Sequence, residues 1–143
     1  MGVAQEAAVR ALLEELEGQE RDAARVERVV SRMAADARYQ VHAGDDPLVG
    51  HDAIRAEFLR QASRMSEIRN EIVTIGSVDQ IVFTERLDSF TFNDKSLTVH
   101  IAGVFEVNAA GKITAWRDYF NSGEIAVQVG ADGSPAGERR SAP

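Results

Sequence analysis

Gly111-Lys-Ile-Thr-Ala-Trp-Arg-Asp-Tyr-Phe-Asn121 is the stretch of sequence around which the chain is organised. From Ile113 to Phe120 it is rich in aromatic and β-branched residues and follows a glycine turn, a composition typical of a β-strand. Because side chains alternate along a strand, Trp116, Asp118 and Phe120 share one face. Burying a carboxylate between two large rings costs free energy. Asp118 is therefore either exposed to water or paired with another polar group for a functional role.

A candidate partner lies in a second charged cluster, Thr84-Glu85-Arg86-Leu87-Asp88. The same alternation places Arg86 and Asp88 on one face of another strand, together with Thr84 and Phe90. If the two strands belong to one curved sheet, Asp88 and Asp118 converge on Arg86 inside an apolar hollow. The sequence therefore predicts a buried group of two carboxylates and one guanidinium.

Composition and charge limit the classes of partner. The chain has 143 residues, a net charge of −7, no basic run and no cysteine. Phosphate backbones and anionic membrane surfaces are bound by clustered Lys and Arg, so neither nucleic acid nor a membrane is expected as a partner. The N-terminus lacks the pattern of a signal peptide, and no apolar run reaches the length of a membrane span. We therefore expect a soluble cytoplasmic protein without disulfides.

Apolar periodicity and turn residues predict three helices followed by strands. The predicted helices are Gln5–Leu16, a second one capped by Asp22, and about His51–Met65. The second helix carries Ala23, Val26, Val29, Val30 and Met33 on one stripe, and the third turns Ile54, Phe58, Leu59 and Ala62 inward. A short strand covers Ala37–His42, and Gly44–Gly50 is a loop. Four longer strands are predicted at Ile68–Ile75, Gln80–Phe92, Ser96–Asn108 and Lys112–Asn121, with hairpin turns at Asn93–Lys95 and Ala109–Gly111.

Helices followed by a run of hairpin strands indicate an α+β fold. Long strands that bend around helices leave a concave, partly apolar face, which suits a small-molecule pocket. We expect one domain over residues 1–129. Residues 130–143 are rich in Gly, Ser, Pro and charge, a composition that predicts a disordered tail.

Several motifs together resemble the limonene-1,2-epoxide hydrolase family. The similarity runs from about Glu17 to Phe120, and its motifs are Tyr39-Gln40, Thr84–Asp88, Gly103-Val104-Phe105 and Gly111–Phe120. The resemblance implies the cone-shaped fold of the nuclear transport factor 2-like superfamily, in which N-terminal helices pack in a curved mixed or antiparallel sheet. The most specific element is Arg-x-Asp followed, about one hairpin later, by Trp-Arg-Asp-Tyr-Phe.

In this family an arginine holds two aspartates, and the three open an epoxide without a covalent intermediate. The resemblance places these roles on Arg86, Asp88 and Asp118, with Asp118 as general base and Asp88 as general acid. It also makes Tyr39 a ligand of the attacking water. Family members have asparagine two residues after that tyrosine as a further water ligand, whereas this chain has Val41. The neighbouring His42 is expected on the opposite face of the strand.

The residues themselves support this chemistry. Opening an epoxide requires a proton on the ring oxygen while a nucleophile attacks carbon from the opposite side. One carboxylic acid and one carboxylate suffice if their pKa values are pushed apart. An arginine between two aspartates stabilises one negative charge, and the second aspartate then keeps its proton more easily. From the residues alone either aspartate could be the acid. No metal or organic cofactor is needed.

The candidate substrate-binding residues are the apolar side chains expected on the same concave face. They are Val41, Phe90, Val99, Ile101, Trp116 and Phe120. Each is an equally ordinary core residue. The predicted substrate is a small or medium, mostly apolar epoxide, which is opened to a vicinal diol.

Other functions are open at this point. One is an epoxide-opening cyclase of the polyether type, whose nucleophile is the substrate's own hydroxyl. Another is a non-catalytic small-molecule-binding or dimer-forming module, and a third is a ketosteroid-isomerase-like proton shuttle. Family analogy predicts a homodimer formed through the convex sheet face, with Leu87, Phe105 and Tyr119 as candidates for that face. The three histidines, His42, His51 and His100, lack the spacing of metal ligands, so no metal site is predicted.

Overall fold

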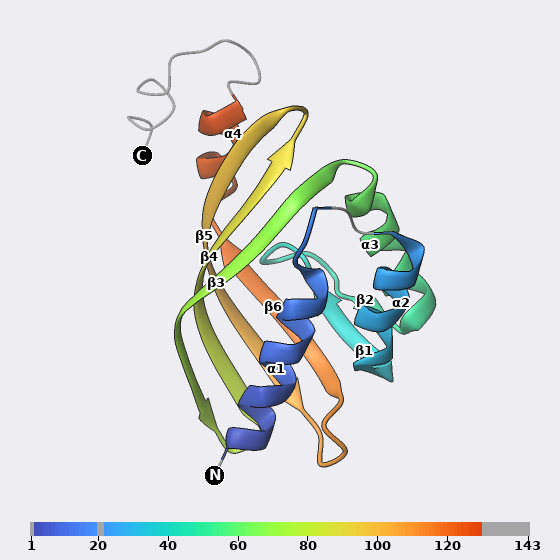
Figure 1. The fold of residues 1–143 in the computed structure, drawn as a ribbon. Helices are drawn as coiled ribbons and strands as arrows, with labels where there is room; N and C mark the ends of the chain where they lie inside the picture. The colour runs from blue at the N-terminus through green and yellow to red at the C-terminus, as the bar shows by residue number, and fades with distance from the viewer. Residues whose placement is uncertain (1, 20–21, 130–143) are drawn as a thin grey trace.

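The structure is a computed structural model that describes residues 2–19 and 22–129 (Figure 1). In chain order the elements are α1 (Val3–Leu16), α2 (Ala23–Ser31), β1 (Met33–Gln40), β2 (Leu48–Val49), α3 (His51–Ala62), β3 (Met65–Val78), β4 (Ile81–Phe92), β5 (Lys95–Val107), β6 (Ile113–Phe120) and α4 (Ser122–Val129). The predicted tail, residues 130–143, lies outside the described residues.

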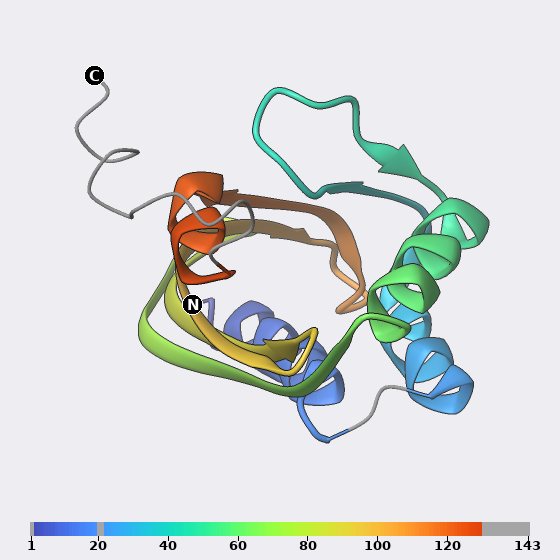
Figure 2. The same cartoon turned by 90° about the horizontal axis from the view of Figure 1, so that it is seen from above.

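The described strands form one sheet in the order β2-β1-β6-β5-β4-β3. β1 runs parallel to β6, and every other neighbouring pair is antiparallel. The sheet curves around α1, while α2 and α3 lie together beside the open side of the curve (Figure 2). The predicted α+β class and the nuclear transport factor 2-like fold are confirmed. Because strands and helices enclose the concave face from two sides, side chains on that face are withdrawn from water.

The core lies between α1 and the concave face of the sheet. α1 buries Val9, Leu12, Leu13 and Leu16, which recur at helical spacing. α2 begins at its predicted cap, where the Asp22 side chain accepts a hydrogen bond from the backbone N–H of Arg25 at 2.9 Å. The fold is thus stabilised where the apolar stripes of the helices meet the sheet.

Several predicted boundaries are wrong: the third helix ends at Ala62 instead of Met65, the first strand is Met33–Gln40 instead of Ala37–His42, and Leu48–Val49 in the predicted loop form β2. Met33 was placed on the stripe of the second helix, but α2 ends at Ser31 and Met33 is the first residue of β1. The residue is buried as expected, with 2% of its surface exposed, yet it pairs with Ile113 of β6. A position three residues after Val30 fits a helical stripe equally well, so only the pairing with β6 decides its conformation.

The hairpin between β4 and β5 sets the register of the site. Its turn residues Asn93 and Asp94 both have positive φ, 49° and 64°. Two such residues make the type I′ turn that matches the twist of antiparallel strands. The turn aligns Phe92 with Lys95, and continuing along the ladder it aligns Asp88 with Val99. The predicted hairpin at this position is confirmed.

The sequence did not predict α4, which covers an edge of β5. β6 ends at Phe120, opposite Ile101, so the first half of β5 extends beyond its neighbour. The side-chain amide of Gln128 takes the place of a strand there: its Oε1 accepts from Thr98 N at 2.9 Å and its Nε2 donates to Thr98 O at 2.6 Å. Covering the edge in this way satisfies backbone groups that would otherwise be open to another chain.

The outer face of the sheet differs from the prediction at one residue. Phe105 was expected there, but it is fully buried and lies opposite Trp116, on the concave face. Tyr119 is 42% exposed on the outer face, and Phe83 is 46% exposed. Association of two copies through this face stays a prediction. In the part of the chain that the structure describes, no helix combines the length and apolar character needed to cross a membrane.

Candidate active site

The three predicted acid–base residues come from two strands that do not touch each other. Arg86 and Asp88 lie on β4 and Asp118 lies on β6, with β5 between them. Gly103 of β5 is the registered partner of Thr84 on one side and of Asp118 on the other. The guanidinium of Arg86 can therefore reach Asp118 only by crossing the backbone of β5 at Gly103.

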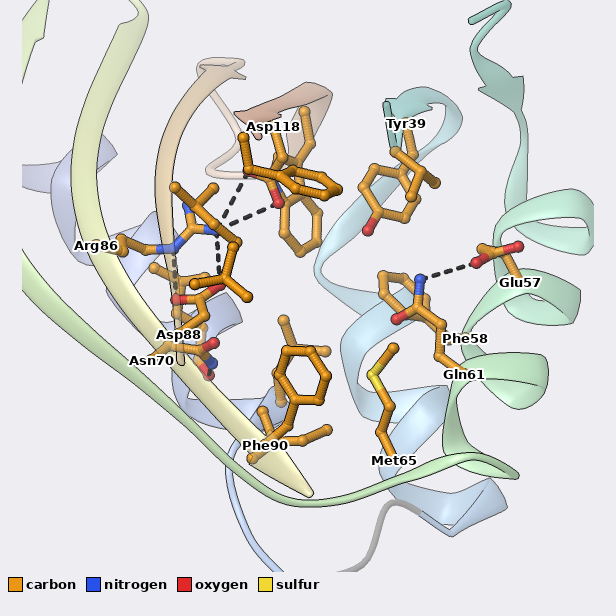
Figure 3. A pocket seen from close by; sticks show the side chains of 18 of the residues that line it. Tyr39, Glu57, Phe58, Gln61, Met65, Asn70, Arg86, Asp88, Phe90 and Asp118 are labelled. Atoms are coloured by element: carbon orange, nitrogen blue, oxygen red, sulfur yellow. Dashed lines mark hydrogen bonds and ion pairs between the residues drawn. The ribbon is translucent and has the colours of Figure 1, made fainter. Parts of the chain in front are cut away.

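Arg86 donates hydrogen bonds to both aspartates (Figure 3). Its Nε and Nη2 reach the two oxygens of Asp88 at 3.1 and 3.0 Å. Nη2 also reaches the two oxygens of Asp118 at 3.3 and 3.2 Å. The third nitrogen, Nη1, donates to the hydroxyl of Thr84 at 3.0 Å. The side chain of Arg86 is 1% exposed, so its position is fixed on every side.

Asp118 has a second donor on its own strand. The indole N–H of Trp116 donates to its Oδ1 at 2.8 Å. Burial raises the pKa of Asp118 above its ordinary value, and the charge of Asp88 acts in the same direction; Arg86 and the indole oppose the rise without cancelling it. Burial lowers the pKa of Arg86, but the two aspartates more than offset this and leave it a permanent cation.

Aromatic side chains form a wall beside the three predicted acid–base residues, Arg86, Asp88 and Asp118, which are called the acid–base group below. Tyr39 of β1 is registered with Trp116 of β6, and their rings stack with centroids 4.6 Å apart. Tyr39 also stacks on Phe58 of α3 at 5.3 Å. Figure 3 shows Tyr39 across the pocket from Asp118 and Arg86, with its hydroxyl toward the interior. The parallel pairing of β1 with β6 places this tyrosine in the site.

These side chains enclose a pocket of about 240 Å³. The residues predicted to line it all do so: Val41, Phe90, Val99, Ile101, Trp116 and Phe120. Apolar residues that the sequence analysis did not include are Leu13, Leu16, Phe58, Met65, Ile68 and Ile125. Space of this size accepts a small molecule rather than a peptide or a nucleic acid strand.

The structure corrects the predicted position of His42. Strand alternation predicted it on the face opposite Val41, but β1 ends at Gln40, so the alternation no longer applies. His42 lines the pocket together with Val41, and its ring lies 5.3 Å from the ring of Phe120. A polar ring therefore stands at the pocket rim where an apolar border was expected.

Helix α3 adds a polar wall that was also missed. Glu57 accepts from Arg60 at 2.7 Å and from Gln61 at 2.8 Å, and all three residues line the pocket. Burial raises the pKa of Glu57, but the hydrogen bonds from Arg60 and Gln61 outweigh it, so the net shift is downward and Glu57 stays ionised.

The helical spacing of the sequence could have predicted that Gln61 belongs to this wall. Gln61 follows Phe58 by three positions and Ile54 by seven, which puts it on the inward stripe. Leu59, which was predicted inward, is 42% exposed instead. The error came from ranking residues by hydrophobicity rather than by position on the helix.

Asn70 of β3 is the last missed residue. It lines the pocket and is the registered cross-strand partner of Asp88. Strand alternation with its exposed charged neighbours, Arg69 and Glu71, places it on the inward face, but nothing in its own strand says what it faces there. Only the pairing of β3 with β4 brings it to the acid–base group.

Comparison with known proteins places the chain in a family. The family model described as the limonene-1,2-epoxide hydrolase catalytic domain matches residues 3–129. A solved structure of an M. tuberculosis epoxide hydrolase of this type is 27% identical, with a TM-score of 0.71, and the match covers 85% of this chain and 86% of that one.

More distant structures share the fold alone. A protein from Xanthomonas campestris that is proposed to be a polyketide cyclase is 17% identical, with a TM-score of 0.76 over 88% of this chain and 96% of that one. A hypothetical protein with a ketosteroid isomerase-like fold from Catenulispora acidiphila is 18% identical, with a TM-score of 0.73 over 91% and 95%. A shared fold does not fix function, so function must be argued from the site.

Proposed function

The chain belongs to the limonene-1,2-epoxide hydrolase family, and we propose that it opens an epoxide to a vicinal diol in one step, without a covalent intermediate. The observation that carries the proposal is the contact of one buried guanidinium with two carboxylates at the wall of a small-molecule pocket. Epoxide opening needs an acid and a base on opposite sides of the ring, and this group can supply both.

Charge balance favours one proton on the pair of aspartates. Arg86 carries one positive charge, so two ionised aspartates leave the buried group with one negative charge. A single proton on either aspartate makes the group neutral, which is the cheaper state where water is excluded. Burial and the neighbouring Asp88 raise the pKa of Asp118, which moves the pair toward this singly protonated state.

We assign Asp88 as the general acid and Asp118 as the general base, following the family resemblance. Burial raises the pKa of Asp118, so once this carboxylate is ionised it takes a proton from water more readily than an exposed carboxylate does. The bond between the ring oxygen and one carbon breaks as that oxygen takes the proton of Asp88. A water oxygen bonds to the same carbon from the opposite side, and its proton passes to Asp118. Exchange with solvent then removes the proton from Asp118 and returns one to Asp88.

Tyr39 is the proposed ligand of the attacking water, since its side chain faces Asp118 across the pocket (Figure 3). A water molecule that attacks carbon must be held, deprotonated and aimed. The hydroxyl of Tyr39 and the carboxylate of Asp118 provide two of these contacts. Val41 provides none through its side chain.

Single-turnover hydrolysis in ¹⁸O-water tests the proposal. After a panel of terpene, aryl and polyketide-type epoxides has identified a substrate, enzyme in excess should convert it to a diol with one labelled oxygen in the first turnover. An ester intermediate would instead deliver an unlabelled carboxylate oxygen in that turnover. An unlabelled diol, or no turnover of any epoxide in the panel, would overturn the proposal.

Val41 favours a second candidate, an epoxide-opening cyclase. If the water site has been given up, an apolar wall at this position would accommodate a substrate chain that carries its own hydroxyl nucleophile. The same labelling experiment separates the two candidates, because a cyclase would release an unlabelled cyclic ether. We favour hydrolysis, since the acid, base, arginine and tyrosine positions all match the hydrolase pattern.

A further inference from the structure

Asn70 is the polar side chain on the strand next to the proposed acid. It lies on β3 directly opposite Asp88 of β4, and Figure 3 shows the two side by side on one wall of the pocket. Directly opposed residues on antiparallel strands have Cβ atoms about 4.5–5.5 Å apart. The other cross-strand neighbour of Asp88 is Val99, which cannot form a hydrogen bond through its side chain.

The nitrogen of the Asn70 side chain has a structural task. Nδ2 donates to the carbonyl of Leu13 at 3.0 Å. Leu13 lies in the last turn of α1, where carbonyl groups have no partner within the helix. The backbone N–H of Asn70 donates to Glu17 at 2.9 Å. These bonds attach β3 to the end of α1 and fix the orientation of the amide.

The oxygen of the same amide, Oδ1, takes no part in attaching β3 to α1. Asn70 lines the pocket and its Nδ2 is directed to Leu13, whereas Oδ1 accepts no hydrogen bond among residues 2–19 and 22–129. Binding the free carbonyl at the end of α1 requires only a hydrogen-bond donor, which is Nδ2. This structural role therefore does not explain why the side chain also presents an acceptor, Oδ1. A half-buried carbonyl oxygen beside an apolar pocket gains most from a ligand that donates to it.

We propose that Asn70 makes the pocket selective for epoxides that carry a hydroxyl group on the carbon next to the ring. This inference rests on the proposed function, because the epoxide oxygen must lie at Asp88. In such an epoxy alcohol the ring oxygen and the hydroxyl are separated by two carbon atoms. With the ring oxygen at Asp88, the hydroxyl therefore reaches the neighbouring position on β3, where Oδ1 of Asn70 accepts its proton.

The test compares ligands that differ in one group. Trp116 is the only tryptophan of the chain and lines the pocket, so its fluorescence reports binding. Kd is measured by rapid mixing, before turnover, for trans-2,3-epoxyhexan-1-ol and for trans-2,3-epoxyhexane with the wild-type chain and Asn70→Leu. Loss of one neutral hydrogen bond should shift the ratio of the two Kd values against the alcohol by roughly five- to tenfold. Loss of the α1 cap weakens both ligands alike and cancels in the ratio.

Two controls complete the test. Arg69→Leu changes the neighbouring residue on the same strand, whose side chain is exposed and does not line the pocket, and should leave the ratio as in the wild type. The methyl ether of the alcohol keeps its oxygen but cannot donate, so the wild type should bind it more weakly than the alcohol. That comparison needs no variant and holds even if Asn70→Leu does not fold.

The outcomes separate this inference from the proposed function. An unchanged ratio in folded Asn70→Leu, or equal binding of alcohol and ether, overturns the role of Asn70 whether or not the epoxides are hydrolysed. A preference for the alcohol that depends on Asn70, without turnover of any epoxide, supports the role of Asn70 and contradicts the hydrolase.

Discussion

The guanidinium of Arg86 lies against the backbone of Gly103, in the place that a side chain at position 103 would occupy. A methyl group added at Gly103 would overlap Nη1 of Arg86 and come within 2.9 Å of the side-chain oxygens of Asp118 and Thr84. The middle strand thus carries a glycine because the arginine must pass over it. A glycine inside a strand often marks such a close approach.

We expect Gly103→Ala to lower turnover by roughly 100-fold, because displacing a catalytic group by about 1 Å has effects of this size. The measurement is kcat/KM for the best epoxide of the panel. Gly76→Ala is the matched control: Gly76 also lies in a strand, but an added methyl group there meets nothing within 4 Å. A folded Gly103→Ala with the rate of the control would show that Arg86 does not need this path.

The acid–base group itself gives the second prediction. Asp118→Asn, Asp88→Asn and Arg86→Gln should each lower kcat by about 10²–10⁴-fold, the usual contribution of acid–base catalysis. Circular dichroism serves as the folding control. Arg117→Gln changes an arginine on the same strand as Asp118 that pairs with Glu106 outside the pocket, and it should keep the rate. Near-parental rates in all three folded variants would contradict the mechanism.

The third prediction concerns the indole of Trp116. Its N–H lowers the pKa of Asp118, so Trp116→Phe should raise that pKa. If Asp118 acts as a base it must be ionised, and the acidic limb of the kcat/KM profile should move to higher pH. Phe105→Leu, which alters packing against the same indole without removing a hydrogen bond, should leave the limb in place. An acidic limb that stays in place while the basic limb moves to higher pH would instead identify Asp118 as the acid.

Stability should depend on pH through the same carboxyl group. Because burial raises the pKa of Asp118 in the folded chain, its protonated form stabilises the fold, and this contribution is lost as pH rises through the raised pKa. Asp118→Asn has no charge to lose. The difference in Tm between Asp118→Asn and the wild type should therefore be larger, in favour of the variant, at pH 8 than at pH 4. In a domain of this size about 1 kcal/mol corresponds to roughly 4 °C. An equal difference at both pH values would mean that the ionised carboxylate is fully compensated.

Position 41 gives the last prediction. Val41→Asn introduces the polar contact for water that the family pattern has there, and it should keep or raise hydrolysis. Val41→Leu, which keeps the wall apolar, is the comparison, and both are measured as kcat and KM. A large loss of hydrolysis in folded Val41→Asn, with Val41→Leu still active, would indicate that the apolar wall itself is required.

The sequence by itself determined which side chains of each strand share a face. A strand has a period of two, so the positions of Arg86 with Asp88 and of Trp116 with Asp118 follow from the chain alone. The turn at Asn93 and Asp94 also follows from local preference, since few residue types tolerate positive φ. These local rules place Arg86 with Asp88 and Trp116 with Asp118, whereas the meeting of the two pairs depends on both strands lying in one curved sheet.

Tertiary structure decided everything that depends on which strands lie side by side. Phe105 was assigned to the wrong face although alternation from Val99 and Ile101 along its own strand already places it on the concave face, where it meets Trp116. Tyr39 reaches the site only through the parallel pairing of β1 with β6, and Asn70 only through the pairing of β3 with β4. Such pairings join residues far apart in sequence, and they are selected by the packing of the whole sheet around α1. The periodicity of side chains can be read from the sequence of a single strand, whereas the register of a sheet depends on how two strands pair.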